Sequence, residues 1–154
     1  MTPIKPIAIM LVEDDPGDQK LIKQSLLKQR ISNEIYITGT GEEALEFLEK
    51  AKDDVDGFPV PELILLDLNM PGIGGKEFLK RIKADGQLDT IPVVILTTSD
   101  SDQDIIDSYK LHASGYIKKP VSLIGFKDVL RDLEEYWFVI CKRVSKEQLM
   151  CMKS

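Results

Sequence analysis

Polar side chains that could act together in chemistry follow four of the strand-like runs in this sequence. Two of these runs end in acidic residues, one in hydroxyl-bearing residues and one in a lysine. The residues are Glu13, Asp14 and Asp15 after one run, Asp67 after another, Thr97, Thr98 and Ser99 after a third, and Lys119 after the last. If the runs are parallel strands of one sheet, their carboxyl ends lie at the edge where α/β proteins bind ligands. The sequence therefore predicts a pocket that combines carboxylates, a hydroxyl and an ammonium group.

The chemistry predicted for such a pocket is metal-dependent phosphoryl transfer. Neighbouring carboxylates repel one another in a low-dielectric cleft, and a bound cation relieves that repulsion. A site that offers only oxygen ligands favours a hard cation such as Mg²⁺, and the sequence has no cluster of His and Cys residues that would indicate zinc. Asp67 could then attack phosphorus to form an acyl phosphate. The oxygens of that group would accept hydrogen bonds from Lys119 and the Thr97 hydroxyl.

Each of these residues also has a structural interpretation that needs no chemistry. The acidic residues at 13–15 could cap the helix that follows them, and Asp67 could form a turn before Asn69 and the Pro-Gly pair. Thr97 could be an ordinary strand residue, and Lys119 could be a solvated surface lysine. The arrangement favours a shared pocket, because the residues follow successive strands in the order acid, acid, hydroxyl, lysine.

The segments that must position these residues alternate between strand-like and helix-like patterns. The first, "IAIMLV", is a continuous apolar run, as in a strand that is buried on both faces. Segments with apolar residues at helical spacing separate the runs, and the segment at 53–61 is a predicted loop. We predict strands at 7–12, 34–39, 62–68, 91–99 and 114–120, and helices around 21–27, at 41–52, 74–84 and 101–113, and from about Ser122 onwards. This order predicts an α/β fold of the doubly wound (βα)5 type, with a five-stranded parallel sheet and helices on both faces.

Length and composition indicate one globular domain. A chain of 154 residues can bury its own core without disulfides. The net charge of −6 argues against nonspecific nucleic-acid binding. The two cysteines, Cys141 and Cys151, are too few for a disulfide framework, so we expect a cytoplasmic protein. No apolar run approaches the roughly 20 residues that span a bilayer, and the polar N-terminus does not resemble a signal peptide.

Four motifs, "LVEDDP", "LLDLNMPGIGG", "ILTTS" and "GYIKKP", occur in the order and spacing of the receiver domains of bacterial two-component response regulators. The sequence resembles that family from residue 7 to about 135. The resemblance implies a flavodoxin-like receiver fold and a protein that accepts a phosphoryl group from a sensor histidine kinase in a Mg²⁺-dependent reaction. Such a protein is not an enzyme in the usual sense, although it assists its own phosphorylation and dephosphorylation. Thr98 and Gly74 stand where the family often has Ala and an acidic residue.

The resemblance also implies a role for each residue of the pocket. Asp67 corresponds to the phosphoacceptor, Asp14 to a direct Mg²⁺ ligand and Glu13 to an acid that acts mostly through water. Asp67 also belongs to the metal site, whereas Asp15 matches a variable position and is left out of it. The remaining roles are a further metal ligand (the Asn69 backbone carbonyl), phosphoryl contacts (Thr97 and Lys119), an aromatic switch residue (Tyr116), positions that tune dephosphorylation (Asn69 and Ser99) and a cis bond before Pro120.

We expect residues 1–154 to form one receiver domain without an effector domain, with a core at about 7–135 and a helical extension at about 136–150. Apolar residues cover more than one helical face of the extension, so we expect a second burial surface there, with local packing against the sheet as the alternative. The predicted interface residues of a homodimer are Tyr136, Trp137, Phe138 and Ile140. This stretch and the loop at 53–61 resemble single-domain regulators paired with phytochrome-type histidine kinases, in which the C-terminal helix supports a dimer.

Three alternative functions fit the sequence less well. A P-loop NTPase would need GxxxxGK[ST] after the first strand, where "EDDPGDQK" stands instead. A phosphatase of the haloacid-dehalogenase type would carry an acidic residue at the position of Asn69. A pseudo-receiver, which binds a partner without phosphorylation, would not need the acidic pair, Asp67, Thr97 and Lys119 together.

Overall fold

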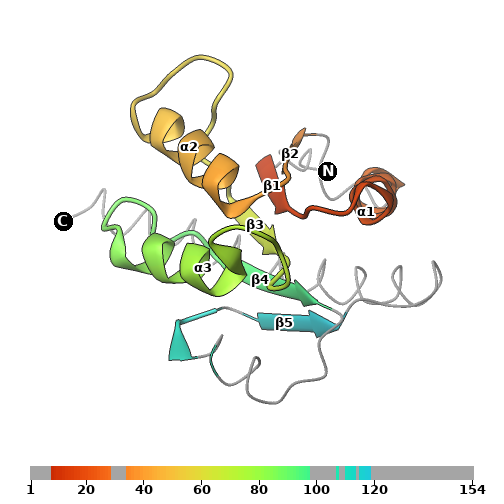
Figure 1. The fold of residues 1–154 in the computed structure, drawn as a ribbon. Helices are drawn as coiled ribbons and strands as arrows, with labels where there is room; N and C mark the ends of the chain where they lie inside the picture. The colour runs from red at the N-terminus through yellow and green to blue at the C-terminus, as the bar shows by residue number, and fades with distance from the viewer. Residues whose placement is uncertain (1–7, 29–33, 98–106, 108–109, 114, 119–154) are drawn as a thin grey trace, which may run out of the picture.

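The computed structural model describes residues 8–28, 34–97, 107, 110–113 and 115–118. In this part of the chain, five strands form one parallel sheet in the order β2-β1-β3-β4-β5. The strands are β1 (Ala8–Val12), β2 (Glu34–Thr38), β3 (Leu63–Leu66), β4 (Val93–Thr97) and β5 (Gly115–Lys118), and the helices are α1 (Pro16–Lys28), α2 (Gly41–Lys52) and α3 (Gly74–Ala84). Figure 1 shows α1 on one side of the sheet and α2 and α3 on the other. The predicted doubly wound fold with a five-stranded parallel sheet is confirmed.

The central strand β1 is buried along its whole length, as its continuous apolar sequence predicts. Successive side chains of a strand point to opposite faces of the sheet. Met10 accordingly belongs to the core cluster that contains Phe78 of α3, whereas Ile9 belongs to the cluster that contains Ile22 of α1. The strand that leads into Glu13 is therefore held between two apolar layers.

The helices α2 and α3 have the predicted bounds, 41–52 and 74–84. A reciprocal pair of hydrogen bonds fixes the start of α2. The Glu43 N–H donates to Thr40 Oγ1 at 3.1 Å, and the Gly39 N–H donates to Glu43 Oε2 at 3.0 Å. The first bond is the N-cap bond of Thr40, which satisfies an N–H group that the first helical turn leaves without a helical partner. The second bond ties the residue before the cap to the same glutamate.

Among the described residues, three strands are shorter than predicted. The strand expected at 34–39 ends at Thr38, and the other two are shortened for local reasons. The expected strand at 62–68 ends at Leu66, because Asp67 turns the chain and its Oδ1 accepts the Asn69 N–H at 3.0 Å. The expected strand at 91–99 begins at Val93, because Pro92 has no N–H to donate to a neighbouring strand. An alternation of apolar and polar residues cannot show either effect.

Several predicted segments lie outside the described residues, namely the helix from about Ser122, the extension at 136–150 and most of the helix at 101–113. Of the last segment, Asp107 and residues 110–113 are described. Asp107 and Lys110 are helical, but Leu111 and His112 form a turn and Ala113 is irregular, so the helix ends earlier than predicted. Among the helices that the structure describes, none combines the length and the apolar character needed to cross a bilayer.

Candidate metal centre

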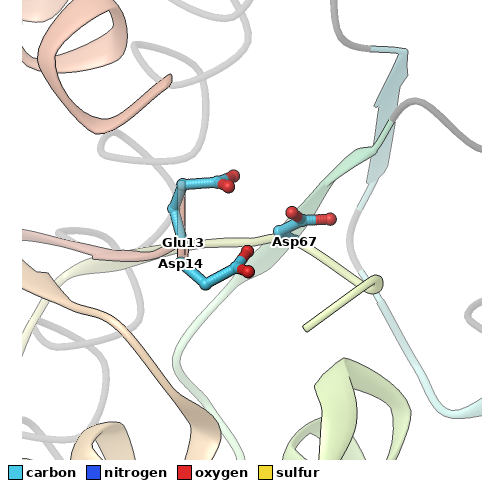
Figure 2. A group of neighbouring side chains, drawn as sticks. All are labelled: Glu13, Asp14 and Asp67. Atoms are coloured by element: carbon cyan, nitrogen blue, oxygen red, sulfur yellow. The ribbon is translucent and has the colours of Figure 1, made fainter. Parts of the chain in front are cut away.

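Three carboxylates converge at the carboxyl end of the sheet. Glu13 and Asp14 follow β1, and Asp67 follows β3, which is paired with β1. The residues after the two strands start side by side, because Val12 pairs with Leu66 in the parallel register. One carboxylate oxygen from each of the three acidic residues lies within 4.8 Å of the other two. Figure 2 shows the three side chains gathered at the ends of the two strands.

The surroundings of the three carboxylates differ. Glu13 is 1% exposed and Asp67 is 5% exposed, whereas Asp14 lies at the surface. Buried carboxylates at this separation repel one another, and a divalent cation would offset the repulsion. The donor set consists of carboxylate oxygens, which suits Mg²⁺ or Mn²⁺ better than a thiol- or imidazole-seeking metal. The residues therefore fit a hard divalent cation.

Three hydrogen bonds hold Glu13 in place, two at its backbone and one at its side chain. Its N–H donates to the Thr38 carbonyl of β2 at 3.0 Å, and its Oε1 accepts the Asp15 N–H at 3.2 Å. Its carbonyl oxygen accepts a hydrogen bond from Gln19 Nε2 at 2.6 Å. Sequence reasoning missed Gln19. The only signal was a side-chain amide in the first turns of the helix that follows the acidic pair.

Asp15, the third acidic residue after β1, has a different role from Glu13, Asp14 and Asp67. It precedes Pro16, the first residue of α1, and its Oδ2 accepts the Asp18 N–H at 2.8 Å. Its carbonyl accepts the Gln19 N–H at 2.9 Å. Asp15 is therefore the N-cap of α1, with proline in the favoured first helical position. The capping interpretation is correct for Asp15, and the structure places Glu13 and Asp14 beside Asp67 instead.

A close approach of α3 positions Asp67 from the other side. A Cβ atom at Gly75 would lie 2.5 Å from the Asp67 carbonyl oxygen and 2.6 Å from Leu68 Cα, so only glycine fits there. The intervening loop is also tied to α2, because the Ile73 N–H donates to Glu42 Oε1 at 2.7 Å. These contacts restrict the backbone immediately after β3.

The structure describes only some of the other predicted site residues. Asn69 is exposed, and its N–H donates to Asp67 Oδ1. Thr97 is the last residue of β4 and pairs with Lys118 of β5. Tyr116 lies within β5, so the backbones of Thr97 and Tyr116 belong to neighbouring strands of the sheet. The predicted residues outside the described ranges are Thr98, Ser99, Lys119, Pro120, Tyr136, Trp137, Phe138 and Ile140.

Comparisons with known proteins agree with this arrangement. The family model described as the response regulator receiver domain matches residues 9–131. The response regulator Rcp1 of Synechocystis sp. is 39% identical over 132 residues, which cover 86% of this chain and 89% of that protein. A crystal structure of the phosphorylated cyanobacterial phytochrome response regulator RcpA is 36% identical and covers 87% of this chain and 95% of that one, with a TM-score of 0.77. The Mn²⁺-bound form of Rcp1 is 38% identical and covers 86% of this chain and 94% of that one, with a TM-score of 0.76. The chain therefore belongs to the response regulator receiver domain family and is related to phytochrome response regulators.

Proposed function

We propose that this protein is a phosphoacceptor in two-component signalling, and that a sensor histidine kinase transfers a phosphoryl group to Asp67. The observation that carries the proposal is the convergence of Glu13, Asp14 and Asp67 within 4.8 Å at the ends of β1 and β3. Membership of the receiver family supports it, and the resemblance of "LLDLNMPGIGG" to a motif of that family assigns the phosphoacceptor position to Asp67. On this proposal the protein is a substrate that assists its own phosphorylation and dephosphorylation, and not an enzyme in the usual sense.

The proposed cofactor is Mg²⁺, held by Asp14 directly, by Glu13 mostly through water, by Asp67 and by the Asn69 backbone carbonyl. When bound, the cation screens the carboxylates and binds a phosphoryl oxygen, so that an anionic donor can approach. The oxygen-only donor set and the Mn²⁺-bound form of the relative Rcp1 support a divalent cation at this position.

In the proposed transfer, an Asp67 carboxylate oxygen attacks phosphorus and forms a new O–P bond. The bond between phosphorus and the histidine nitrogen of the kinase breaks, and the leaving imidazole keeps the electron pair and takes a proton from solvent. The Asn69 N–H at 3.0 Å from Asp67 Oδ1 orients the carboxylate for this attack. We assign the Thr97 hydroxyl and the Lys119 ammonium group as donors to the phosphoryl oxygens.

Phosphorylation adds about −1.5 to −2 units of charge at one point, and we propose that this charge changes the surface of the molecule. Thr97 would move towards the phosphoryl group and Tyr116 would move inwards. Asn69 and Ser99 would set the rate at which the phosphoryl group is lost. The output would be partner binding or self-association as a homodimer, with interface residues Tyr136, Trp137, Phe138 and Ile140.

We further propose that the kinase partner is of the phytochrome type and that the protein acts in the cytoplasm, without nucleic acid or membrane as a partner. The kinase proposal is supported by the relative RcpA, a phytochrome response regulator at 36% identity. Phosphotransfer from a purified phytochrome-type histidine kinase tests it directly.

The first prediction concerns Asp67→Asn. With Mg²⁺ and acetyl phosphate, the wild-type protein should gain the mass of one phosphoryl group, and Asp67→Asn should gain none, because an amide is not a nucleophile for phosphorus. Asp15→Asn is the matched control and should be labelled like the wild type, because Asp15 caps a helix outside the pocket. Intact-protein mass spectrometry measures the labelling, and sedimentation of the same samples reports self-association.

Other outcomes point to other functions. Equal labelling of Asp67→Asn and the wild type would contradict the assignment. Continuous turnover of the donor would indicate an NTPase or a phosphatase. No response to acetyl phosphate or fluoroberyllate would indicate a pseudo-receiver that acts only by binding a partner.

A further inference from the structure

A hydrogen bond from α1 reaches the backbone between the two acidic residues of the pocket. Gln19 lies in the first turns of α1, and its Nε2 donates to the Glu13 carbonyl oxygen at 2.6 Å in a partly buried environment. That carbonyl belongs to the peptide group that joins Glu13 to Asp14. Gln19 touches neither carboxylate in this contact. It acts on the peptide unit that connects them.

The orientation of this peptide group decides where both carboxylates lie. The six atoms of a peptide unit form a rigid plane, so a hydrogen bond to its oxygen restrains the Cα atoms at both ends. On one side, Glu13 is already held by its N–H bond to the Thr38 carbonyl at 3.0 Å. The Gln19 bond fixes the direction in which the chain leaves Glu13 towards Asp14. With this geometry, Glu13 is 1% exposed, Asp14 lies at the surface, and both reach Asp67.

The donor itself stands on a well-anchored element. Ile22 and Leu26 of α1 are 1% and 0% exposed in the core, and Asp15 caps the first turn. A group that orients metal ligands is effective when its own position is fixed in this way. Partners that orient ligands, without binding the metal themselves, commonly change metal affinity by about 10–100-fold when they are removed.

We infer that Gln19 is a positioning residue of the metal centre, which holds the Glu13–Asp14 peptide so that both carboxylates face Asp67. This inference rests on the proposed function of the carboxylate pocket. It assigns to α1 a part in cation binding in addition to its part in the core.

The test uses a substitution that keeps the length of the side chain and removes its N–H donors, Gln19→Met. Gln24→Met, the same change at an exposed position of α1, is the matched control. Calorimetry gives the Kd for Mg²⁺, and labelling by acetyl phosphate is followed as a function of Mg²⁺ concentration. We expect Gln19→Met to raise the Kd for Mg²⁺ about tenfold and to be labelled at the wild-type rate once Mg²⁺ is saturating. Gln24→Met should match the wild type in both measurements.

A role in general stability alone would lower the thermal midpoint of the metal-free protein and leave the Kd unchanged, and that result overturns the inference. Slow labelling that persists at saturating Mg²⁺ also overturns it. If circular dichroism shows that Gln19→Met does not fold, Gln19→Ala, with a good helix former, is measured in the same way and should also raise the Kd. A wild-type protein that neither binds Mg²⁺ nor accepts a phosphoryl group would refute the proposed function. A normal wild type with an unchanged Kd in the variant would refute only the role of Gln19.

Discussion

Asp14 and Asp15 are adjacent in the chain and have different surroundings. A carboxylate oxygen of Asp14 lies within 4.8 Å of those of Glu13 and Asp67, whereas Asp15 Oδ2 accepts the N–H of Asp18 at 2.8 Å and caps α1. Substitution of the two residues should therefore affect two different properties of the protein.

Asp15→Ala should lower the free energy of unfolding by about 1 kcal/mol, because it removes a helix N-cap. It should change the Kd for Mg²⁺ much less than Asp14→Ala does, because Ile22 and Leu26 still anchor α1 in the core. Asp14→Ala should raise that Kd by more than about tenfold, because it removes a proposed charged ligand. Urea denaturation of the metal-free proteins measures the first quantity and calorimetry the second. If Asp15→Ala weakened Mg²⁺ binding as much as Asp14→Ala did, the division of roles would be wrong.

Gly75 is a residue at which a single methyl group should disturb the pocket. Its added Cβ would lie 2.5 Å from the Asp67 carbonyl oxygen, and that backbone is held by strand pairing and cannot move freely. We expect Gly75→Ala to cost about 1–3 kcal/mol in stability and to slow labelling of Asp67 at saturating Mg²⁺. Gly86→Ala is the control, since nothing lies within 4 Å of its added Cβ. Mass spectrometry over time and urea denaturation measure both effects, and normal behaviour of Gly75→Ala would show that α3 can shift.

At the scale of the elements, Asp54, which directly follows the C-cap of α2, is poorly suited to the backbone conformation at that position. The Asp53 and Val55 N–H groups donate to the Glu49 and Lys50 carbonyls at 3.1 and 3.0 Å, which closes the helix. Between them, Asp54 has a φ of 57°, in the left-handed region that glycine adopts without strain. Its carboxylate also stands at the negative end of the helix dipole.

Asp54→Gly should therefore raise the free energy of unfolding by about 0.5 kcal/mol. The loss of backbone strain and of the unfavourable charge should stabilise the folded protein more than glycine's added conformational entropy stabilises the unfolded chain. Asp54→Asn separates the charge from the strain and should gain less. Thermal and urea denaturation provide the measurement. Asp56→Gly serves as the control, because Asp56 is a nearby exposed residue of the same loop without a positive φ, and it should not stabilise the protein.

At the scale of the whole molecule, an ion pair connects the ends of two helices on the same face of the sheet. Lys52 Nζ, at the end of α2, lies 2.7 Å from Asp85 Oδ2, just after α3, and 3.1 Å from Glu49 Oε1. The hydrogen bond from Lys52, followed by that from the Gln87 N–H, holds the pKa of Asp85 below its usual 3.8. The hydrogen bonds to Asp85 and then Glu49 raise the pKa of Lys52 above its usual 10.5.

These pKa shifts predict how stability depends on pH. The contribution of Asp85 is present above its unfolded pKa of 3.8 and is lost as the pH falls through its lower folded pKa. The contribution of Lys52 is complete below 10.5 and is lost as the pH rises through its higher folded pKa. Lys83 acts oppositely at high pH, because burial lowers its pKa and stability rises with pH up to 10.5. The acid side is therefore the clearer place to measure the ion pair.

We expect Asp85→Asn to make the free energy of unfolding depend less steeply on pH below about pH 4. Urea denaturation at a series of pH values between roughly 2 and 7 gives this dependence. Glu46→Gln is the control, since its pair with Lys50 is 3.6 Å long with the Glu46 side chain 70% exposed, and it should leave the slope nearly unchanged. An identical slope in Asp85→Asn and the wild type would show that the ion pair does not couple the two helices.

Local patterns in the sequence predicted much of the fold. The bounds of α2 and α3 were predicted correctly, because the capping residues Thr40 and Glu43 and the apolar spacing act within a few residues of one another. The ends of β3 and β4 were predicted less well. The side-chain hydrogen bond of Asp67 turns the chain at the end of β3, and the missing N–H of Pro92 delays the start of β4, both inside otherwise apolar runs.

At the site, the sequence by itself determined which chemical groups follow the strands and hence that a hard cation and a phosphoryl group suit them. Only the tertiary structure decided which of these groups meet. The strand order places β1 beside β3, and the start of α1 at Pro16 turns Asp15 into a cap while Asp14 faces Asp67. The contact from Gln19 to the Glu13 carbonyl depends on the same geometry, because sequence patterns report local conformation and burial, whereas register and helix position set the direction of each side chain.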